Sequence, residues 1–412
     1  MALPQSILIV GGGVFGLSTA LSLSERHPNN KITLIEASPT IPNPHGSSVD
    51  SSRIIRADYA NPAYAKLAAA GIKKWRTTEW GKDGRYTENG LALLYADDNP
   101  DSERYTRKSY ENVKRLLEEE GGGGGGGEKG ADKVVYLSTK ADVEKVVPRY
   151  AAGMNIAGGY LNRGSGWGDA ESGVRFAKQK LDELNKVTIK HGEVERLIFE
   201  DRDAQKTSSP LKVAGVILKD NLTGTTTTVT ADLVILATGA STPKLIDLRG
   251  MVEATGQVLA YIKISDEEQA QLAHMPTILS FSTGMFIIPP RNNELKIARH
   301  AYGYLNPQDI PIPGTTRSSN NEQQTMNISV PVYNVPVPAE GEDACRRALR
   351  EMLPAFAERP FVRTRICWYS DTYVFFFFFF FFFFFDANTK RLEKLTNSMR
   401  IIYGMKDPPE IS

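Results

Sequence analysis

The hydrophobic pattern near the amino terminus predicts a strand, a helix and a second strand. Residues 6–10 form a continuous apolar run, which is typical of a strand buried on both faces of a parallel sheet. The next segment repeats apolar side chains at helical spacing, and the sequence KITLI at 31–35 predicts a second strand that ends at Glu36. These three segments in succession predict a β-α-β unit.

The turn between the first strand and the helix is rich in glycine. Gly11, Gly13 and Gly16 match the pattern GxGxxG. In this pattern the first glycine permits a tight turn, the second lets the backbone approach a pyrophosphate, and the third lets the helix pack on the strand. Glu36 ends the second strand, where a carboxylate can bind a ribose hydroxyl. We therefore predict a dinucleotide site, the alternative being a glycine-rich turn in another kind of α/β protein.

Beyond this unit the chain alternates helix-like and strand-like segments. Apolar residues at helical spacing predict helices at 62–75, 102–120, 169–184 and 343–352. Short apolar or alternating runs predict strands at 187–190, 211–218, 225–229, 232–237, 257–264, 285–289 and 327–331. The short strands before 232 favour a meander that returns to the parallel sheet at 232–237. We expect a turn at 238–240, including Gly239, where the backbone has room to approach a cofactor again.

The composition is that of an ordinary globular protein. Its 412 residues include 49 basic and 48 acidic side chains, so the net charge of +1 gives no bias toward nucleic acid or an anionic membrane. We therefore expect neither kind of partner. The hydrophobic fraction of 41% suffices for one large core or two ordinary domains.

Cysteine usage and the amino terminus favour an intracellular protein. Cys345 and Cys367 are too few for a disulfide framework and lack zinc-ligand spacing, so we expect no metal site. Residues 1–5 lack the charged segment that begins a signal peptide. We therefore expect a protein that stays in a reducing compartment and is not secreted.

Two runs of a single residue type interrupt the pattern. Residues 121–127 are all glycine, and we expect a flexible surface loop at 121–130 because ordering glycine costs the most backbone entropy. Residues 375–385 are all phenylalanine. That run is too short to span a bilayer as a helix, and it cannot face a core on one side only.

Four segments of the chain can be compared with known families: ILIVGGGVFGLS at 7–18, GSSVDSSRIIRADY at 46–59, ELKIARH at 294–300 and RICWYSDT at 365–372. Together they resemble the monomeric sarcosine oxidase family of FAD-dependent amine oxidases. Fungal saccharopine, pipecolate and fructosyl-amino-acid oxidases belong to the same group. The resemblance extends over residues 6–372.

The resemblance implies an α/β fold with two domains. The first is an FAD-binding, Rossmann-like domain of the glutathione-reductase or D-amino-acid-oxidase type, expected at 1–85 and 151–248. The second is a substrate domain with a mixed sheet, expected at 86–150 and 249–366. Residues 367–372 would begin the return to the FAD-binding domain.

The cofactor implied by the resemblance is FAD. The residues implied to bind it are Gly11, Gly13, Val14, Phe15, Gly16, Glu36, Ser52, Arg53, Val194, Gly239 and Cys367. Cys367 matches a cysteine that forms a thioether with the flavin. The alternative for Cys367 is a small hydrophobic residue of the core.

Arg53 and Arg56 match arginines that lie over the flavin and bind the substrate carboxylate, a task suited to the planar, permanently charged guanidinium. Their spacing would place them on one face of a helical turn. The alternative is that they are solvated or paired with Asp50 and Asp58. Fructosyl-amine oxidases usually have lysine at the position of Arg53, which slightly favours the sarcosine, pipecolate and saccharopine side of the family.

Lys296 and His300 complete the catalytic residues implied by the resemblance. Lys296 matches a lysine near flavin N5, where its charge promotes the reaction with O₂. Its alternative is an exposed lysine at a strand edge. His300 matches an active-site histidine, whereas a histidine without such a match is more often structural.

The activity implied is hydride transfer from a secondary amine derived from an amino acid to the flavin, followed by reduction of O₂ to H₂O₂. The substrates would be sarcosine or another N-methyl amino acid, saccharopine or pipecolate, with a fructosyl-amino-acid oxidase as an alternative. The resemblance also implies a monomer in the cytoplasm or in peroxisomes. An NAD-dependent dehydrogenase would share the first β-α-β unit but leaves Arg53, Lys296 and Cys367 unexplained.

The resemblance stops after Thr372. The family continues there with further strands and a turn like Gly-His-Gly-Phe-Lys that contacts flavin and substrate, whereas residues 373–412 hold no such turn. We expect this tail not to adopt the family fold. Its codons could contain a splice donor followed by a thymidine tract, which favours a retained intron. A catalytically inert FAD-binding remnant is therefore an alternative function.

Overall fold

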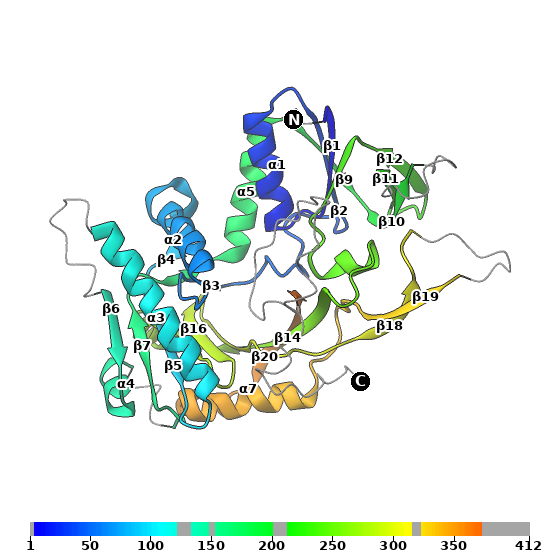
Figure 1. Cartoon of the computed structure of the whole chain (residues 1–412). Helices are drawn as coiled ribbons and strands as arrows, with labels where there is room; N and C mark the ends of the chain where they lie inside the picture. Colours follow the sequence, from blue (N-terminus) through cyan, green and yellow to red (C-terminus); the bar gives the residue numbers. More distant parts are fainter. Residues whose placement is uncertain (1–3, 122–132, 148–152, 201–211, 315–322, 373–412) are drawn as a thin grey trace.

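The computed structural model describes residues 4–121, 133–147, 153–200, 212–314 and 323–372. Figure 1 shows a small sheet with helices near the amino terminus and a larger curved sheet below it. Most of the predicted glycine loop, the run of phenylalanines and the predicted tail at 373–412 lie outside the described residues. The fold is mixed α/β, as predicted.

A four-stranded parallel sheet forms the amino-terminal part, with the order β13-β1-β2-β9. Its strands are β1 (Ser6–Val10), β2 (Lys31–Glu36), β9 (Val187–His191) and β13 (Leu233–Leu236). Helices α1 (Val14–Arg26) and α5 (Ala170–Leu184) pack their apolar sides on one face of it (Figure 1). The predicted β-α-β unit is confirmed.

A three-stranded antiparallel meander covers the other face of this sheet. It consists of β10 (Glu193–Phe199), β11 (Val213–Lys219) and β12 (Thr226–Thr230). Leu197, Val216 and Leu218 of the meander form one core cluster with Leu8 and Ile35 of the parallel sheet. The chain then enters β13, so the predicted return to the parallel sheet is also confirmed.

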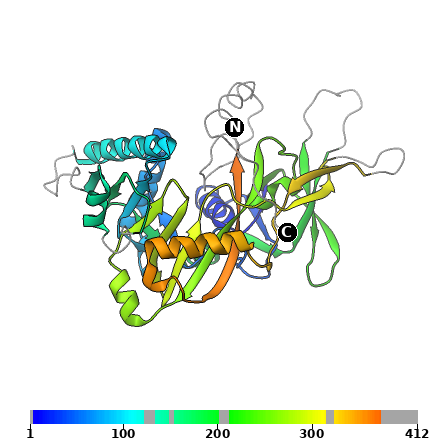
Figure 2. The same cartoon turned by 90° about the horizontal axis from the view of Figure 1, so that it is seen from below.

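An eight-stranded mixed sheet dominates the rest of the molecule, with the order β20-β14-β17-β16-β15-β5-β7-β6. Its strands are β5 (Leu91–Tyr95), β6 (Val134–Leu137), β7 (Gly158–Asn162), β14 (Val252–Lys263), β15 (Thr277–Ser280), β16 (Met285–Arg291), β17 (Glu294–Arg299) and β20 (Phe361–Thr372). Helix α7 (Ala339–Met352) lies along it (Figure 2) and buries Cys345 in the core.

The remaining described elements are short or peripheral. The helices are α2 (Pro62–Thr77), α3 (Pro100–Gly121), α4 (Lys140–Val146) and α6 (Asp266–Leu272), with 3₁₀ turns η1 (Glu79–Gly81), η3 (Gly239–Lys244) and η4 (Pro354–Phe356). The strands are β3 (Arg53–Ile55), β4 (Tyr86–Thr87), β8 (Gly166–Gly168), β18 (Pro307–Pro311) and β19 (Thr325–Ser329).

Two element boundaries differ clearly from the prediction. Strand β14 begins at Val252 rather than at residue 257, because it pairs with β20 from Val252 onward. Helix α7 begins at Ala339 rather than at residue 343, because acidic residues are favourable in a first helical turn even though this turn has no apolar period. The predicted domain boundary between residues 366 and 367 falls inside β20, which continues unbroken there.

Candidate functional site

A cavity of about 870 Å³ lies between the glycine turn and the carboxyl-terminal half of β20. We call it the dinucleotide cavity. The predicted cofactor residues that line it are Gly11, Gly13, Val14, Phe15, Glu36, Val194 and Gly239. His300 and the β20 residues 368–372 line it as well. The structure therefore joins the first β-α turn to the last described strand.

The three glycines of the turn are constrained in different ways. Gly11 has a φ of +107°, and a Cβ there would lie 2.3 Å from the carbonyl oxygen of Ala237. A Cβ on Gly16 would lie 1.8 Å from the carbonyl oxygen of Gly11, so Gly16 permits close packing beneath the turn rather than lining the cavity. A Cβ on Gly13 would meet Ser48 Oγ at 3.3 Å and no other heavy atom within 4 Å. Gly13 therefore leaves room above the turn.

Glu36 is buried where a ribose hydroxyl is expected. Its Oε2 accepts a hydrogen bond from the backbone N–H of Gly12 at 2.6 Å. Its Oε1 accepts from the backbone N–H of Ser38 at 2.8 Å and from Asn43 Nδ2 at 2.9 Å. An ionised carboxylate has about four acceptor positions, so one is left for a ligand hydroxyl. Glu36 and the glycine turn together fit the ribose and pyrophosphate of a dinucleotide.

A second group of predicted residues converges on Asp50, whose side chain is buried. Its Oδ2 accepts hydrogen bonds from Arg53 Nη1 at 2.7 Å and from Lys296 Nζ at 3.0 Å. Its Oδ1 accepts from the hydroxyl of Tyr261 at 2.7 Å. Burial alone would raise the pKa of Asp50, but Lys296 and Arg53 hold it well below its usual range. Asp50 is therefore a carboxylate that serves two cations.

Lys296 lies on β17, between β14 and β16, and its exposed fraction is 2%. The alternative of an exposed lysine at a strand edge is therefore wrong. Its Nζ also donates to the carbonyl of Ser52. Burial lowers the pKa of Lys296 to about 8, although the charge of Asp50 acts in the opposite direction.

Arg53 connects this group to Cys367. Its Nη2 donates to Cys367 Sγ at 3.1 Å and to the carbonyl of Ser47, also at 3.1 Å. Cys367 lies on β20 with no exposed surface. The ion pair between Arg53 and Asp50, predicted as the alternative to a substrate-binding Arg53, is present in the structure. It lies in the interior and is not a solvated surface pair.

The predicted helical turn through Arg53 and Arg56 is wrong. Arg53–Ile55 is strand β3, which pairs antiparallel with Gly166–Gly168 in β8. This pairing with a distant segment holds the backbone in an extended conformation. The guanidinium groups of Arg53 and Arg56 therefore contact different aspartates. Arg53 reaches the side chain of Asp50, whereas Arg56 reaches the backbone of Asp58.

Arg56 is held by Asp58 and by aromatic rings. Its Nη1 donates to the carbonyl oxygen of Asp58, and its guanidinium lies 4.4 Å from the ring centroid of Tyr59. The Asp58 carboxylate is fully buried and accepts hydrogen bonds from Tyr160, Asn162 and Ser165. This network fixes the backbone that holds Arg56.

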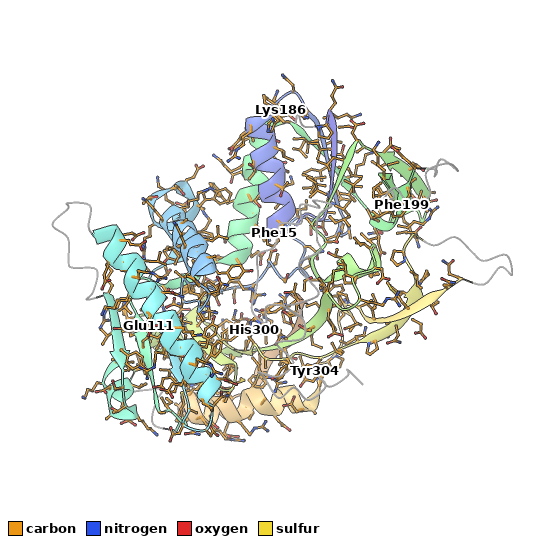
Figure 3. The ribbon with its side chains drawn as sticks, viewed as in Figure 1. Phe15, Glu111, Lys186, Phe199, His300 and Tyr304 are labelled. Atoms are coloured by element: carbon orange, nitrogen blue, oxygen red, sulfur yellow. The ribbon has the colours of Figure 1, made fainter. Side chains whose placement is uncertain are left out.

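His300 lies between the dinucleotide cavity and the arginines. It lines the cavity, and its ring packs edge-on against Tyr369 with a centroid distance of 5.0 Å. Figure 3 shows His300 in the view between Phe15 of α1 and Tyr304. Burial, reinforced by the charges of Arg56 and Arg53, lowers the pKa of His300 to about 3. His300 is therefore neutral near pH 7.

The structure thus places the predicted site residues in two adjacent groups. Those that do not line the dinucleotide cavity are Gly16, Ser52, Arg53, Arg56, Lys296 and Cys367. From the sequence, Asp50 is expected only as a possible partner of an arginine. The signal that points to it is charge, because a buried lysine beside a buried arginine needs an anion.

Asp371 is a further residue of the site, and the sequence alone does not single it out. It lines the cavity and accepts a hydrogen bond from the hydroxyl of Thr255. Burial raises the pKa of Asp371 to about 6, despite that hydrogen bond. Asp371 lies opposite Glu253 of β14, and the negative charge of Glu253 raises the pKa of Asp371 further.

Two negative findings apply to the described part of the chain. There, no group of three or more His, Cys, Asp or Glu residues is arranged to hold a metal ion. No helix within the same ranges is long and apolar enough to cross a membrane.

Comparison with known proteins gives matches along most of the chain. The family described as FAD dependent oxidoreductase (DAO) matches residues 6–380, past the point where we expected the resemblance to end. The amino acid oxidase imqH of Aspergillus flavus is 29% identical, covering 90% of this chain and 84% of that protein. L-saccharopine oxidase of Schizosaccharomyces pombe is 27% identical, covering 89% of this chain and 80% of that protein.

Solved structures share the fold. Fructosamine oxidase (Amadoriase II) from Aspergillus fumigatus has a TM-score of 0.67 at 24% identity, covering 91% of this chain and 77% of that one. A modified fructosyl peptide oxidase from Aspergillus nidulans has a TM-score of 0.73 at 23% identity, covering 91% of this chain and 82% of that one. The glycine turn, Glu36 and the cavity beside them fit FAD. The chain therefore belongs to the FAD-dependent oxidoreductase family.

Proposed function

We propose that the protein oxidises secondary amines derived from amino acids, such as N-methyl amino acids or amines of the saccharopine and pipecolate type. Bound FAD would accept a hydride from the carbon next to nitrogen and pass two electrons to O₂. Overall, the amine, O₂ and water give a carbonyl compound, the shortened amine and H₂O₂. The observation that carries this proposal is the meeting of Arg53, Lys296 and Cys367 beside a dinucleotide cavity.

Arg56 is the better candidate of the two arginines for binding the substrate carboxylate. Arg53 already donates to Asp50, Ser47 and Cys367. Arg56 donates from Nη1 to the backbone of Asp58, which orients the guanidinium and leaves further N–H groups on the same planar fork. Arg53 would then act as a fixed positive charge next to the flavin.

Lys296 and His300 have separate roles in this proposal. Lys296 holds a positive charge in a buried place, where such a charge favours electron transfer to O₂. His300 is neutral and offers a hydrogen bond without adding charge beside the two arginines. No strong base is required if the amine binds in its unprotonated form.

Cys367 is the proposed site of covalent attachment. Its sulfur accepts a hydrogen bond from Arg53, and the next residues of β20, 368–372, line the dinucleotide cavity. Joining sulfur to the flavin methyl carbon removes two protons and two electrons, and O₂ would take these to give H₂O₂. Acid precipitation should leave yellow flavin on the wild-type protein and release it from a Cys367→Ser variant. Release from both would argue against the linkage.

The main experiment follows the flavin spectrum. Anaerobic addition of an amine should bleach the visible absorbance, and admitting air should restore it with release of peroxide. A protein that binds FAD but is bleached by no N-methyl, saccharopine-type or fructosyl amine would instead be the inert remnant. That second candidate is favoured by the residues after Thr372, which lack the family's flavin-contacting turn.

A further inference from the structure

We propose that the substrate end of this site selects amines with an aromatic or apolar amino-acid side chain over amines with additional carboxylates or a sugar. The inference rests on the proposed function and names the substrate class of the same site. It starts from the surroundings of Arg56, the proposed anchor for the substrate carboxylate.

Two aromatic residues, Tyr59 and Tyr105, contact Arg56, and a third, Phe281, stacks on Tyr105; we call these three residues the aromatic wall. The guanidinium lies over the ring of Tyr59 and is hydrogen-bonded to Tyr105. The ring of Tyr105 stacks on that of Phe281, with centroids 4.1 Å apart and an interplanar angle of 14°. The wall is assembled from the segment after β3, from α3 and from the turn after β15.

The wall keeps accessible apolar surface. Each of its three residues is half-buried, in contrast to the fully buried rings of Tyr160 and Tyr261 nearby in the core. Tyr105 and Phe281 pack by one side against a core cluster that also includes Cys367 and Tyr369. Their remaining surface can therefore cover a ligand that Arg56 holds.

The opposite boundary of the site is aromatic and uncharged as well. His300 and Tyr369 pack edge to face, and both line the dinucleotide cavity. Arg53 donates to Cys367, which directly precedes the cavity-lining residues of β20, so the segment that carries both arginines lies beside this end of the cavity. An amine held by Arg56 with its reacting carbon toward the cavity thus lies between two aromatic groups.

Among the described residues, the other charged side chains next to Arg53 and Arg56 already have partners. Arg53 and Lys296 share the carboxylate of Asp50. The carboxylate of Asp58 is saturated by Tyr160, Asn162 and Ser165. A second substrate carboxylate would therefore be desolvated against aromatic rings without a cation to pair with. Sugar hydroxyls placed there would likewise lose hydrogen bonds to water, whereas an apolar side chain would gain contact.

The first test compares amines by kcat/KM for peroxide release from the full-length, FAD-loaded protein. N-methylphenylalanine should exceed sarcosine, saccharopine and fructosyl-valine by about tenfold or more, as apolar pockets discriminate. Equal or better rates with sarcosine, saccharopine or fructosyl-valine would overturn the inference and leave the proposed function standing. No oxidation of any amine would overturn both.

A second test does not require turnover. Phenylacetate and glutarate are titrated into the FAD-loaded protein, and binding is read from the flavin spectrum. Phenylacetate should bind at least about tenfold more tightly, and a Phe281→Ala variant should lose most of this preference. Tyr110→Ala is the matched control, because Tyr110 lies on the same helix as Tyr105 but packs against Tyr136 and Tyr160. Tighter binding of glutarate, or an equal loss in the control, would contradict the inference.

Discussion

The Nζ of Lys296 lies 3.0 Å from Oδ2 of Asp50, although the two residues come from strand β17 and from the loop before β3. Both side chains are buried, and Arg53 binds the same carboxylate oxygen. One anion therefore compensates two cations in the interior. Removing it would leave both charges without compensation, whereas removing either cation would leave a pair.

We expect Asp50→Asn to lower the free energy of unfolding by about 3–5 kcal/mol, the cost of breaking a buried ion pair. Urea unfolding followed by tryptophan fluorescence measures this change. Glu358→Gln is the control, because Glu358 pairs with Arg350 at 3.0 Å on the exposed surface and should cost less than about 1 kcal/mol. Similar losses in the two variants would argue against the central role of Asp50.

The pKa of Lys296, lowered to about 8, gives a kinetic prediction. In the proposed reaction, protonated Lys296 supplies the positive charge that promotes electron transfer to O₂, so the reoxidation of reduced protein should slow as the pH rises through about 8. Lys296→Met should reduce the rate by on the order of 10²-fold at neutral pH and abolish the pH dependence. Stopped-flow mixing with O₂ between pH 6.5 and 9.5 measures both.

Lys296→Arg separates charge from titration in the same experiment. Arginine stays protonated over the whole range, so this variant should keep a rate above that of Lys296→Met and show no decline near pH 8. A decline of the same size in all three proteins would assign the pH dependence to another group.

Asp371 should make stability depend on pH. Its pKa is about 6 in the folded protein and 3.8 as the ordinary value, so the folded state holds the proton longer. Between about pH 4 and pH 6 the Asp371 carboxyl is ionised in the unfolded chain but still protonated in the folded protein. The free energy of unfolding therefore falls as the pH rises through this range. Above pH 6 this loss is complete, and it amounts to about 3 kcal/mol.

Asp371→Asn should remove that loss, because asparagine does not titrate. The difference in unfolding free energy between variant and wild type should therefore shift in favour of the variant between pH 4 and pH 6, and then remain constant. Denaturant unfolding at a series of pH values measures it. A difference that is the same at pH 4 and pH 7 would contradict the prediction.

Substitutions at two glycines of the turn should have large effects. Gly11→Ala and Gly16→Ala would each drive a methyl group into a backbone carbonyl, so we expect loss of bound FAD and a lower melting temperature. Gly71→Ala is the matched control, because Gly71 lies within α2 with no atom near the added methyl group. It should stabilise the protein by about 0.5–1 kcal/mol. Retained FAD in Gly16→Ala would contradict this account.

The local elements could be predicted because their causes are local. The β-α-β unit follows from apolar periodicity and from a glycine turn whose residues are neighbours in the chain. Helix α2 likewise carries its own start signal, since Asn61 caps it and Pro62 is its first residue.

The site could be predicted only in part, because its geometry depends on distant pairings. Arg53 lies on a strand because β8 pairs with it, and no pattern near Arg53 indicates this. Asp50 gains its importance from Tyr261 and Lys296, both more than 200 positions away in the chain. The resemblance indicated Lys296 and Cys367, but their roles in catalysis and in cofactor attachment stay predictions.

Strand β20 has a consequence for the order in which the site is made. Alternate residues of this strand contact five parts of the site. Arg363 lies over the ring of Tyr261, and Arg365 donates to the Val49 carbonyl. Further along, Cys367 contacts Arg53, Tyr369 contacts His300, and Asp371 contacts Thr255. A chain is synthesised from its amino terminus, so the glycine turn exists long before these contacts can form. A nascent chain that has not yet added β20 holds one wall of the dinucleotide cavity and lacks the other, and it can bind the whole cofactor only after that strand has been made.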